Sequence, residues 1–364
     1  MPFRLYSRLS ILIINGHLAS KHHNKKNLWV DSPLLTKQHL KPIMIDLQED
    51  SPIELIRNLP YWNENEIPIS AAPAGVGNMN LVLRVTTNQR TLILKQSKSF
   101  VRKFPQIPAP IQRIEVEYRF YQLVQSCSEL RDLSPKIIHF DAGNYILLTE
   151  DLGAGCDFIG LYSKAKNLDS AQIRQLGFYL KSLHSIKPVS FPSNMEMRKL
   201  NHEHIFNFPF IETNGMNLDA IHYGLQELSL PFKRNRALKI GLKKLGYRYL
   251  ASGNTLIQGD FYPASWLEID QNIKVIDPEF GFMGDAEFDL GVLFAHLKLS
   301  QQSNGLKEQF LDTYSSDFDE KLAAEYESVE IMRRIIGIAQ LPLILSLDAK
   351  KELLINATET LTAS

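Results

Sequence analysis

The stretch LIQGDFYPASWLEIDQNIKVIDPEFGF, which runs from Leu256 to Phe282, places two aspartates after short apolar runs. Asp260 comes shortly after the run TLI, and Asp277 ends the β-rich run IKVID, 17 residues later. The residues between them read as a strand, a turn and a second strand. A single aspartate in such a place is more often a turn residue. Two carboxylates at this separation instead match a phosphoryl-transfer site, in which Asp260 orients an attacking hydroxyl, Asp277 binds magnesium and Ser265 offers the ion a further oxygen.

The bulk composition is that of a globular chain with ample material for a core, since 44% of its 364 residues are hydrophobic and 22% are charged. The 40 basic residues balance the 40 acidic ones, so no net field indicates a nucleic-acid partner. Cys127 and Cys156 have no metal-binding spacing and are too few for a disulfide scaffold. No uninterrupted apolar run reaches 18 residues. We therefore expect a cytoplasmic protein that acts on a small molecule, without membrane or nucleic-acid partners, and a homodimer stays open.

The first 43 residues contain a loose imitation of a signal peptide. Arg4 and Arg8 precede the apolar run LSILII, but this run is short and NGH ends it at once. A basic polar run follows, and it has no obvious small-residue cleavage site. We interpret residues 1–43 as a flexible extension or as the product of an upstream start, with Met44 as a natural alternative beginning.

The first part of the chain is expected to form strands and one long helix. LVLRVTT and RTLILKQ flank turn residues around Asn88 and predict an antiparallel hairpin. Apolar residues at Val116, Phe120 and Val124 form one stripe at helical spacing, which predicts a helix over residues 112–126. KIIHFDAGNYILLTEDL then predicts two more strands around a turn.

Amphipathic helical patterns dominate from Ser170 to the end, interrupted by the strand pair that holds the two aspartates. We therefore predict an α+β fold with two lobes. The small β-rich lobe is expected over 44–150 and the larger, mainly helical lobe over 151–364. A junction between two such lobes is a common place for a small-molecule site.

Small residues precede the first strand of the predicted hairpin, in PAGVGNMNLVLRV. Gly75, Gly77 and Asn78 fit a turn whose backbone N–H groups can approach a phosphate. The segment lacks the third glycine of G-x-G-x-x-G and the adjacent lysine of a Walker loop. By itself it therefore favours an ordinary glycine turn before a hairpin.

Lys95 ends the run TLILKQ on the same strand face as Ile93. Such a lysine is either an exposed strand end or a cation directed at the phosphates of a nucleotide. The following helix offers two carboxylates as its anchor. Glu117 borders the buried stripe of this helix, whereas Glu115 lies further round. We choose Glu117 as the partner of Lys95, against the alternative that it is a surface glutamate.

The segments QGDFYPAS, VIDPEFGF and EFDLG together resemble the catalytic segment of the aminoglycoside phosphotransferase and choline kinase superfamily, which has a protein-kinase-like fold. Within it the chain is most similar to methylthioribose kinases. This similarity rests on GNMN followed by LVLRV, LILKQS with VRK, RIEVE, TEDL, the serine at 265 in place of the usual asparagine, DPEF, and MRRIIGIA. The resemblance covers about residues 70–345. Each motif is weak alone, but their order makes the set specific.

The resemblance implies roles around the reacting phosphate. Asp260 would be the catalytic base, and Asp277 would bind Mg²⁺ together with Ser265 and Glu279. Lys95, held by its glutamate, would bind the α- and β-phosphates of ATP.

Two further segments receive roles from the same resemblance. Residues 149–152, with Glu150 and Leu152, would lie along the adenine. Arg333 and Arg334 match paired arginines that face the sugar substrate and the transferring phosphate. From the residues alone, adjacent arginines point about 100° apart on a helix, so only one need face inward and an exposed pair is the default. An arginine beside a substrate site suits a delocalised phosphate charge.

Some positions depart from the family pattern. Gln258 stands where a histidine is usual, but glutamine keeps a donor and an acceptor with which to support the loop. FYPASW replaces the usual LHTGS, and residues 201–210 match only loosely, which leaves the acceptor open. We interpret His184 as a packing or capping residue and Asp289 as structural support for the catalytic loop.

The leading hypothesis is an ATP- and magnesium-dependent small-molecule kinase, with 5-methylthioribose as the best-supported acceptor. One alternative is a phosphotransferase for another alcohol, such as an aminoglycoside, a choline-like compound or another sugar. Glu203 and Asp219 do not form the acidic cluster that a cationic acceptor requires. The other alternative is a nucleotide-binding pseudokinase, which Gln258 and the incomplete glycine loop suggest.

Overall fold

The computed structural model describes residues 44–75, 77 and 79–363. The expected extension over residues 1–43 and the glycine-loop residue Asn78 lie outside these described residues.

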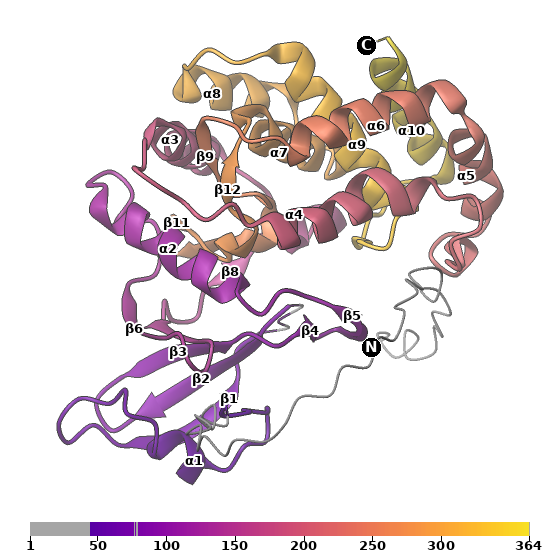
Figure 1. Cartoon of the computed structure of the whole chain (residues 1–364). Helices are drawn as coiled ribbons and strands as arrows, with labels where there is room; N and C mark the ends of the chain where they lie inside the picture. The colour runs from indigo at the N-terminus through magenta and orange to yellow at the C-terminus, as the bar shows by residue number, and fades with distance from the viewer. Residues whose placement is uncertain (1–43, 76, 78, 364) are drawn as a thin grey trace, which may run out of the picture.

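A five-stranded antiparallel sheet forms the smaller lobe, in the lower part of Figure 1. Its strand order is β1-β2-β3-β7-β6. The strands are β1 (Pro68–Pro73), β2 (Leu81–Thr87), β3 (Thr91–Gln96), β6 (Ile137–Asp141) and β7 (Ile146–Glu150). The short helix α1 (Ile53–Arg57) precedes the sheet, and a small hairpin of β4 (Phe100–Val101) and β5 (Phe104–Pro108) follows β3. Leu83, Leu94 and Leu148 are fully buried on the face that forms this lobe's core. The predicted hairpin is the β2–β3 pair, in which Leu83 lies opposite Leu94.

Helix α2 (Arg113–Ser126) connects the two lobes (Figure 1). Ile114 and Tyr121 pack with Leu147 of the sheet, whereas Phe120 and Val124 belong to a core cluster of the helical lobe. The predicted apolar stripe is thus buried, but against the larger lobe. The helix therefore lies at the junction between the lobes, where its residue Glu117 can contact the sheet.

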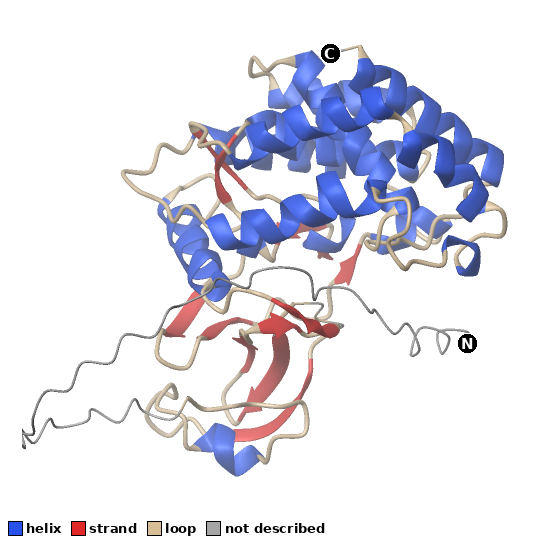
Figure 2. Ribbon diagram, turned by 45° about the vertical axis from the view of Figure 1, so that its right-hand side comes forward, coloured by secondary structure: helices blue, strands red, loops and turns tan. Residues whose placement is uncertain are grey.

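The larger lobe is mainly helical (Figure 2). Helix α7 packs against α9, α3 against α8, and α10 against α9. Its helices are α3 (Ser170–Ser185), α4 (Met195–His202), α5 (Leu225–Arg234), α6 (Arg236–Leu250), α7 (Ala286–Leu299), α8 (Asn304–Tyr314), α9 (Glu320–Ile336) and α10 (Leu347–Thr362), with short helical turns η1 (Ile159–Ser163), η2 (Glu203–Asn207), η3 (Phe208–Phe210), η4 (Leu218–Ala220), η5 (Pro263–Ser265) and η6 (Pro278–Phe280). The α+β prediction with a β-rich and a helical lobe is confirmed.

A three-stranded sheet and a two-stranded sheet hold the loops that carry Asp260 and Asp277. β10 (Trp266–Ile269) and β11 (Asn272–Val275) form the predicted hairpin, and β8 (Cys156–Asp157) pairs with β10. β9 (Thr255–Ile257) pairs with β12 (Phe282–Gly284). One aspartate follows β9 and the other follows β11, so paired strands place both loops on the side of the helical lobe that meets the sheet.

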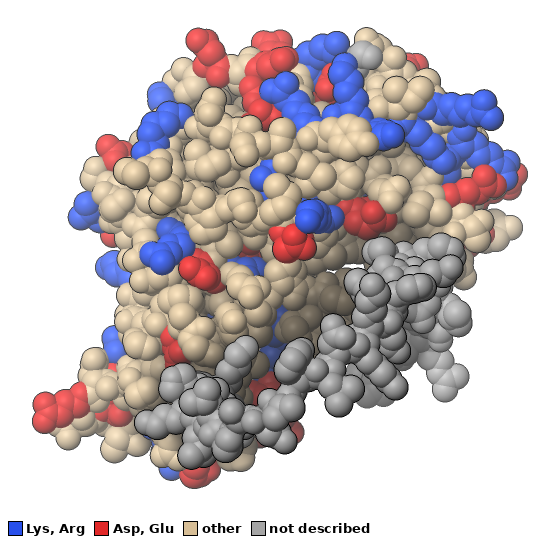
Figure 3. Space-filling model, in the orientation of Figure 1, with Lys and Arg blue, Asp and Glu red and all other residues tan. Residues whose placement is uncertain are grey.

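Charges are unevenly spread although the chain is neutral overall. Lys and Arg side chains gather over α6, at the upper right of Figure 3. The sequence of this helix, RALKIGLKKLGYRYL, contains no acidic residue. In the part of the chain that the structure describes, no helix is long and apolar enough to cross a membrane.

Candidate functional site

The loop that carries Asp260 is supported by one buried carboxylate from α7. Asp289 is fully buried, and its two oxygens accept hydrogen bonds from the backbone N–H groups of Gln258 (2.7 Å) and Gly259 (2.9 Å). His184 contacts Asp289 at 3.3 Å and Tyr314 at 2.9 Å. Asp289 therefore supports the loop as the sequence predicted, and His184, interpreted as a packing or capping residue, packs behind it.

Gln258 joins the two aspartate loops to each other. Its side-chain oxygen accepts a hydrogen bond from the backbone N–H of Asp260 at 2.7 Å. Its amide nitrogen donates to the backbone carbonyls of Ile276 (3.2 Å) and Asp277 (3.4 Å). The side chain is fully buried, so these polar groups have little access to water. Glutamine thus uses both the donor and the acceptor that the sequence argument assigned to it.

The backbone adopts unusual conformations at both loops. Gly259 has φ of 81°, and a Cβ atom there would lie 2.3 Å from the carbonyl oxygen of Phe280. A side chain at this position would therefore push apart the two loops. Asp277 itself has φ of 57°, a left-handed conformation that few residues other than glycine, asparagine and aspartate adopt.

Lys95 lies between two carboxylates at the junction of the lobes. Its Nζ is 2.6 Å from Oε1 of Glu117 on α2, and it also forms an ion pair with Asp277. Burial lowers the pKa of Lys95, but the charges of Asp277 and Glu117 outweigh it and hold this pKa well above its ordinary value. The lysine is therefore a fixed cation. Glu115 is instead 3.9 Å from Arg119 on the outer side of the helix, so the choice of Glu117 as the partner agrees with the structure.

Asp260 faces two arginines from α9. Its Oδ1 is 3.4 Å from Nη2 of Arg333 and 3.5 Å from Nη2 of Arg334. Burial raises the pKa of Asp260 above its ordinary value, although Arg334 and Arg333 oppose this shift. A carboxylate with a raised pKa is a better proton acceptor for a hydroxyl.

The arginine pair corrects the expectation of an exposed pair. Arg333 and Arg334 are each only 5% exposed. Both turn inward because Glu330 lies three and four residues before them, on the same side of the helix. One oxygen of Glu330 accepts from Nε of Arg333 and the other from Nε of Arg334, the latter at 2.7 Å.

The two further residues expected at magnesium make other contacts. The hydroxyl of Ser265 donates to the backbone carbonyl of Asp260 at 3.0 Å. Glu279 accepts from the side-chain amide of Asn80 at 2.9 Å and lies 3.3 Å from Nε of Arg113. Burial raises the pKa of Glu279 to about 8. Glu279 thus links the helical lobe to the sheet and α2, and Asp277 is the more exposed carboxylate of the pair.

The expected adenine segment and glycine turn lie on the sheet side of the junction. Glu150 ends β7, opposite Leu92 of β3, and Leu152 is half-buried. Gly75 has φ of 80°, and a Cβ atom at Gly77 would lie 2.6 Å from the backbone oxygen of Asn80. Both positions therefore suit glycine for different reasons, one for conformation and one for space.

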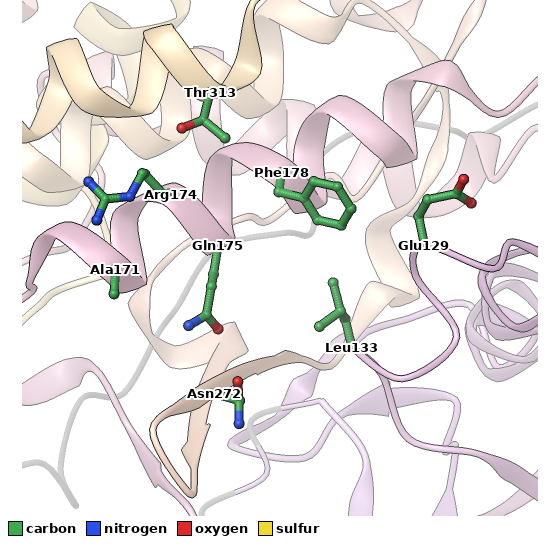
Figure 4. A pocket seen from close by; sticks show the side chains of 8 residues that line it. All are labelled: Glu129, Leu133, Ala171, Arg174, Gln175, Phe178, Asn272 and Thr313. Carbon is green, nitrogen blue, oxygen red and sulfur yellow. The ribbon is translucent and has the colours of Figure 1, made fainter.

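A shallow hollow elsewhere on the surface contains none of these residues. Figure 4 shows it beside α3, with side chains from the segment after α2 and from the β10–β11 hairpin. Its lining residues are Glu129, Leu133, Ala171, Arg174, Gln175, Phe178, Asn272 and Thr313. The candidate site is therefore the junction of the lobes and not this hollow.

Sequence reasoning missed three residues of the site. Glu330, Arg113 and Asn80 are buried and hold the arginine pair or Glu279. Glu330 had a signal, because a glutamate three and four residues before two arginines can contact both on a helix. Arg113 and Asn80 had no such signal in the sequence, because their partner Glu279 lies more than 160 residues away.

Comparisons with known proteins give the following relatives. No family model matches the chain. It is 25% identical over 267 residues to the methylthioribose kinase of Yersinia pseudotuberculosis, a match covering 68% of this chain and 63% of that protein. It is 27% identical over 309 residues to the methylthioribose kinase of Exiguobacterium sibiricum, covering 79% and 77%. The chain thus spans less than two thirds of the length of the Yersinia relative.

A solved structure shares the overall fold. The AMP-bound complex of spectinomycin phosphotransferase APH(9)-Ia superposes with a TM-score of 0.50 and 13% sequence identity, covering 86% of this chain and 97% of that one. At this identity the likeness concerns the fold alone. Together with the β-rich and helical lobes, it confirms the kinase-like fold class.

Proposed function

We propose that this protein is an ATP- and magnesium-dependent kinase that phosphorylates a hydroxyl group of a small sugar-like metabolite. The observation that carries the proposal is the convergence of Lys95, Glu117 and Asp277 beside a separate aspartate, Asp260, whose side chain is 21% exposed. These groups come from both lobes and supply a fixed cation, a metal ligand and a base, the parts on which phosphoryl transfer depends.

Each of these residues has a role consistent with its surroundings. Lys95 would bind nucleotide phosphates, because its charge is held in place by Glu117. Asp260 would orient the acceptor hydroxyl and take its proton, which its raised pKa favours. The guanidinium groups of Arg333 and Arg334 would bind the phosphoryl group during transfer.

The donor set fits magnesium that is held largely by the nucleotide. In the described residues no group of three or more His, Cys, Asp or Glu side chains could hold a metal ion. Asp277 offers a carboxylate that is about half exposed, and magnesium is often bound by one or two carboxylates together with substrate phosphates. Bound there, the ion would neutralise charge on the phosphates.

Within this class, 5-methylthioribose is the acceptor we propose. The named relatives support it, and so does the charge around Asp260. Arg333 and Arg334 lie beside it, and the nearby Glu330 is occupied by both of them. A cationic acceptor would be repelled by these guanidinium groups, which disfavours aminoglycosides and choline-like alcohols.

The test is phosphate transfer from ATP, followed by mass spectrometry, with 5-methylthioribose, other sugars, choline and an aminoglycoside as acceptors. We expect a phosphorylated sugar, and loss of at least about 10³-fold in kcat for Asp260→Asn, because the base is removed. Asp270→Asn, in the exposed turn between β10 and β11, is the matched control and should retain activity.

Different outcomes separate the alternatives. Transfer only to choline or to an aminoglycoside would replace the proposed acceptor class. ATP binding without transfer to any acceptor would show a pseudokinase. Full activity of Asp260→Asn would contradict the assigned base.

A further inference from the structure

Glu330 occupies a central position behind the arginine pair. It lies on α9, is 1% exposed, and its two oxygens are divided between Nε of Arg333 and Nε of Arg334. Among the described residues, Glu330 and Asp260 are the carboxylates that form ion pairs with these two arginines. The two arginines thus share one carboxylate behind them and one in front.

Each guanidinium group uses two different nitrogens for these contacts. Nε of each arginine donates to Glu330, and Nη2 lies near Oδ1 of Asp260, at 3.4 Å for Arg333 and 3.5 Å for Arg334. Because the guanidinium group is planar and its donors have fixed directions, a hydrogen bond at Nε sets the direction of Nη2. The forward contacts are long for hydrogen bonds, so the Nη2 groups stay available to an incoming phosphoryl group.

The surroundings of Glu330 fix its own position. Nε2 of His296 lies 3.0 Å from Oε1 of Glu330, and Nδ1 of His296 lies 2.5 Å from the hydroxyl of Tyr162. Because a carboxylate only accepts, Nε2 of His296 carries the proton and Nδ1 accepts from the tyrosine. The guanidinium group of Arg334 also lies 4.6 Å from the ring centre of Tyr262. Buried side chains therefore hold the glutamate from behind.

The charges of this cluster balance only with Glu330 present. Asp260 and Glu330 together offset the two guanidinium charges, and burial lowers the pKa of His296, which favours its neutral form. Without Glu330, two buried arginines would repel each other and share a single carboxylate, Asp260. Such a cluster would draw both guanidinium groups onto the base, where they would compete with the acceptor hydroxyl.

We propose that Glu330 is a positioning residue that directs Nη2 of both Arg333 and Arg334 toward the transferring phosphoryl group. The inference rests on the proposed kinase function, which it deepens. Glu330 does not touch the reacting atoms but acts through the two arginines. Its substitution should therefore change the transfer step more than it changes nucleotide binding.

Glu330→Gln tests this role. The amide can accept from only one of the two Nε groups, so we expect kcat to fall about 10- to 100-fold while KM for ATP changes less than about twofold. The matched control is Glu327→Gln, one turn earlier on α9. Glu327 is also buried and pairs with Lys298 (2.5 Å) and Lys307 (3.5 Å), away from Asp260. An equal loss in both variants would overturn the proposal, because it would indicate a general effect on α9.

Glu330→Asp separates position from charge and also serves if Glu330→Gln does not fold. Aspartate keeps the charge but is shorter by one methylene, about 1.5 Å. A positioning role predicts that kcat stays at least about fivefold below the wild type. Full recovery in Glu330→Asp would overturn the proposal, because neutralisation of charge would then be sufficient.

An activity-free measurement is the NMR signal of the arginine Nε–H groups, assigned with Arg333→Lys and Arg334→Lys. We expect both signals to shift in Glu330→Gln and neither to shift in Glu327→Gln. If neither signal moves, the shared contact is absent in solution and the proposal fails. If the wild type phosphorylates no acceptor but both signals shift, the proposed function fails while the arrangement of the arginines stands.

Discussion

At the scale of single residues, Gln258 shows how a residue that departs from the pattern the sequence resembles can still support a loop. Its amide joins the N–H of Asp260 to the carbonyls of Ile276 and Asp277, so one side chain holds both aspartate loops. Histidine would offer one donor and one acceptor at a similar distance from the backbone. A buried glutamine with all these contacts shows that the loop around Asp260 is held in place.

Gln258→Leu is predicted to reduce activity and stability together. It leaves the N–H of Asp260 and two carbonyls without their partner, which should lower the free energy of unfolding by about 1–3 kcal/mol. We expect kcat/KM to fall at least about tenfold, because the two loops lose their common contact. Urea denaturation and steady-state kinetics measure both effects. Gln258→His is the control and should lose much less; an equal loss would mean that the amide groups have no part in the support.

At the scale of elements, helices α2 and α5 each bury a charged side chain against neighbouring elements. α2 buries Glu117 at the junction of the lobes and leaves Glu115 outside. α5 presents a different case, because Lys233 is fully buried and its Nζ has no hydrogen-bond partner among the described residues. Burial lowers the pKa of Lys233, which means that the fold disfavours its charged form.

Lys233→Met is predicted to stabilise the protein. Methionine fills a similar volume without an amine to desolvate, so the free energy of unfolding at pH 7.5 should rise by at least about 1 kcal/mol. Urea denaturation followed by circular dichroism measures this change. Lys239→Met on the exposed face of α6 is the control, with an expected effect within about 0.5 kcal/mol. A loss of stability in Lys233→Met would show that the amine has a partner in solution.

At the scale of the whole molecule, contacts between the lobes assemble the site. Lys95 of the sheet meets Asp277 of the helical lobe, and Asn80 and Arg113 meet Glu279. Deeper in the helical lobe, His296 is fully buried behind the arginine pair. Burial lowers the pKa of His296 to about 4, although its hydrogen bond to Glu330 opposes this shift. The stability of the folded chain therefore depends on keeping this imidazole neutral.

The pH dependence of stability follows from His296. In the unfolded chain this histidine takes up a proton near its ordinary pKa of 6.5, whereas in the folded protein it does so only near 4. The unfolded state thus binds more protons in this window, and the histidine's contribution to stability, complete above pH 6.5, is lost as the pH falls toward 4. Between pH 7.5 and 5.0 the free energy of unfolding should fall by roughly 2 kcal/mol from this group.

Urea denaturation at the two pH values checks this prediction in the wild type and in His296→Gln. The substitution is expected to lower stability at pH 7.5 but to flatten its pH dependence, because the titrating group is gone. An unchanged pH dependence would show that His296 already carries a proton when the protein is folded or is not buried in solution.

Several features could be predicted from sequence because they depend on local spacing. The β2–β3 hairpin, the buried stripe of α2 and the choice of Glu117 follow from strand alternation and helical period. The arginine pair shows where such reasoning stops. On the helical wheel only one of Arg333 and Arg334 need face inward, and an exposed pair is the default prediction. Long side chains can bend toward a shared partner, however, and both arginines contact Glu330.

The sequence alone determined the order of the elements, the two lobes, and the residue types from which the phosphoryl-transfer site is proposed, because hydrophobic period and motif spacing act over short distances along the chain. Only the tertiary structure decided which charges meet. It placed Asp277 on Lys95, Glu279 against Asn80 and Arg113, and both arginines in front of Asp260. These partners lie far apart in sequence, and burial makes their pairing necessary, because an unpaired charge in the interior is costly.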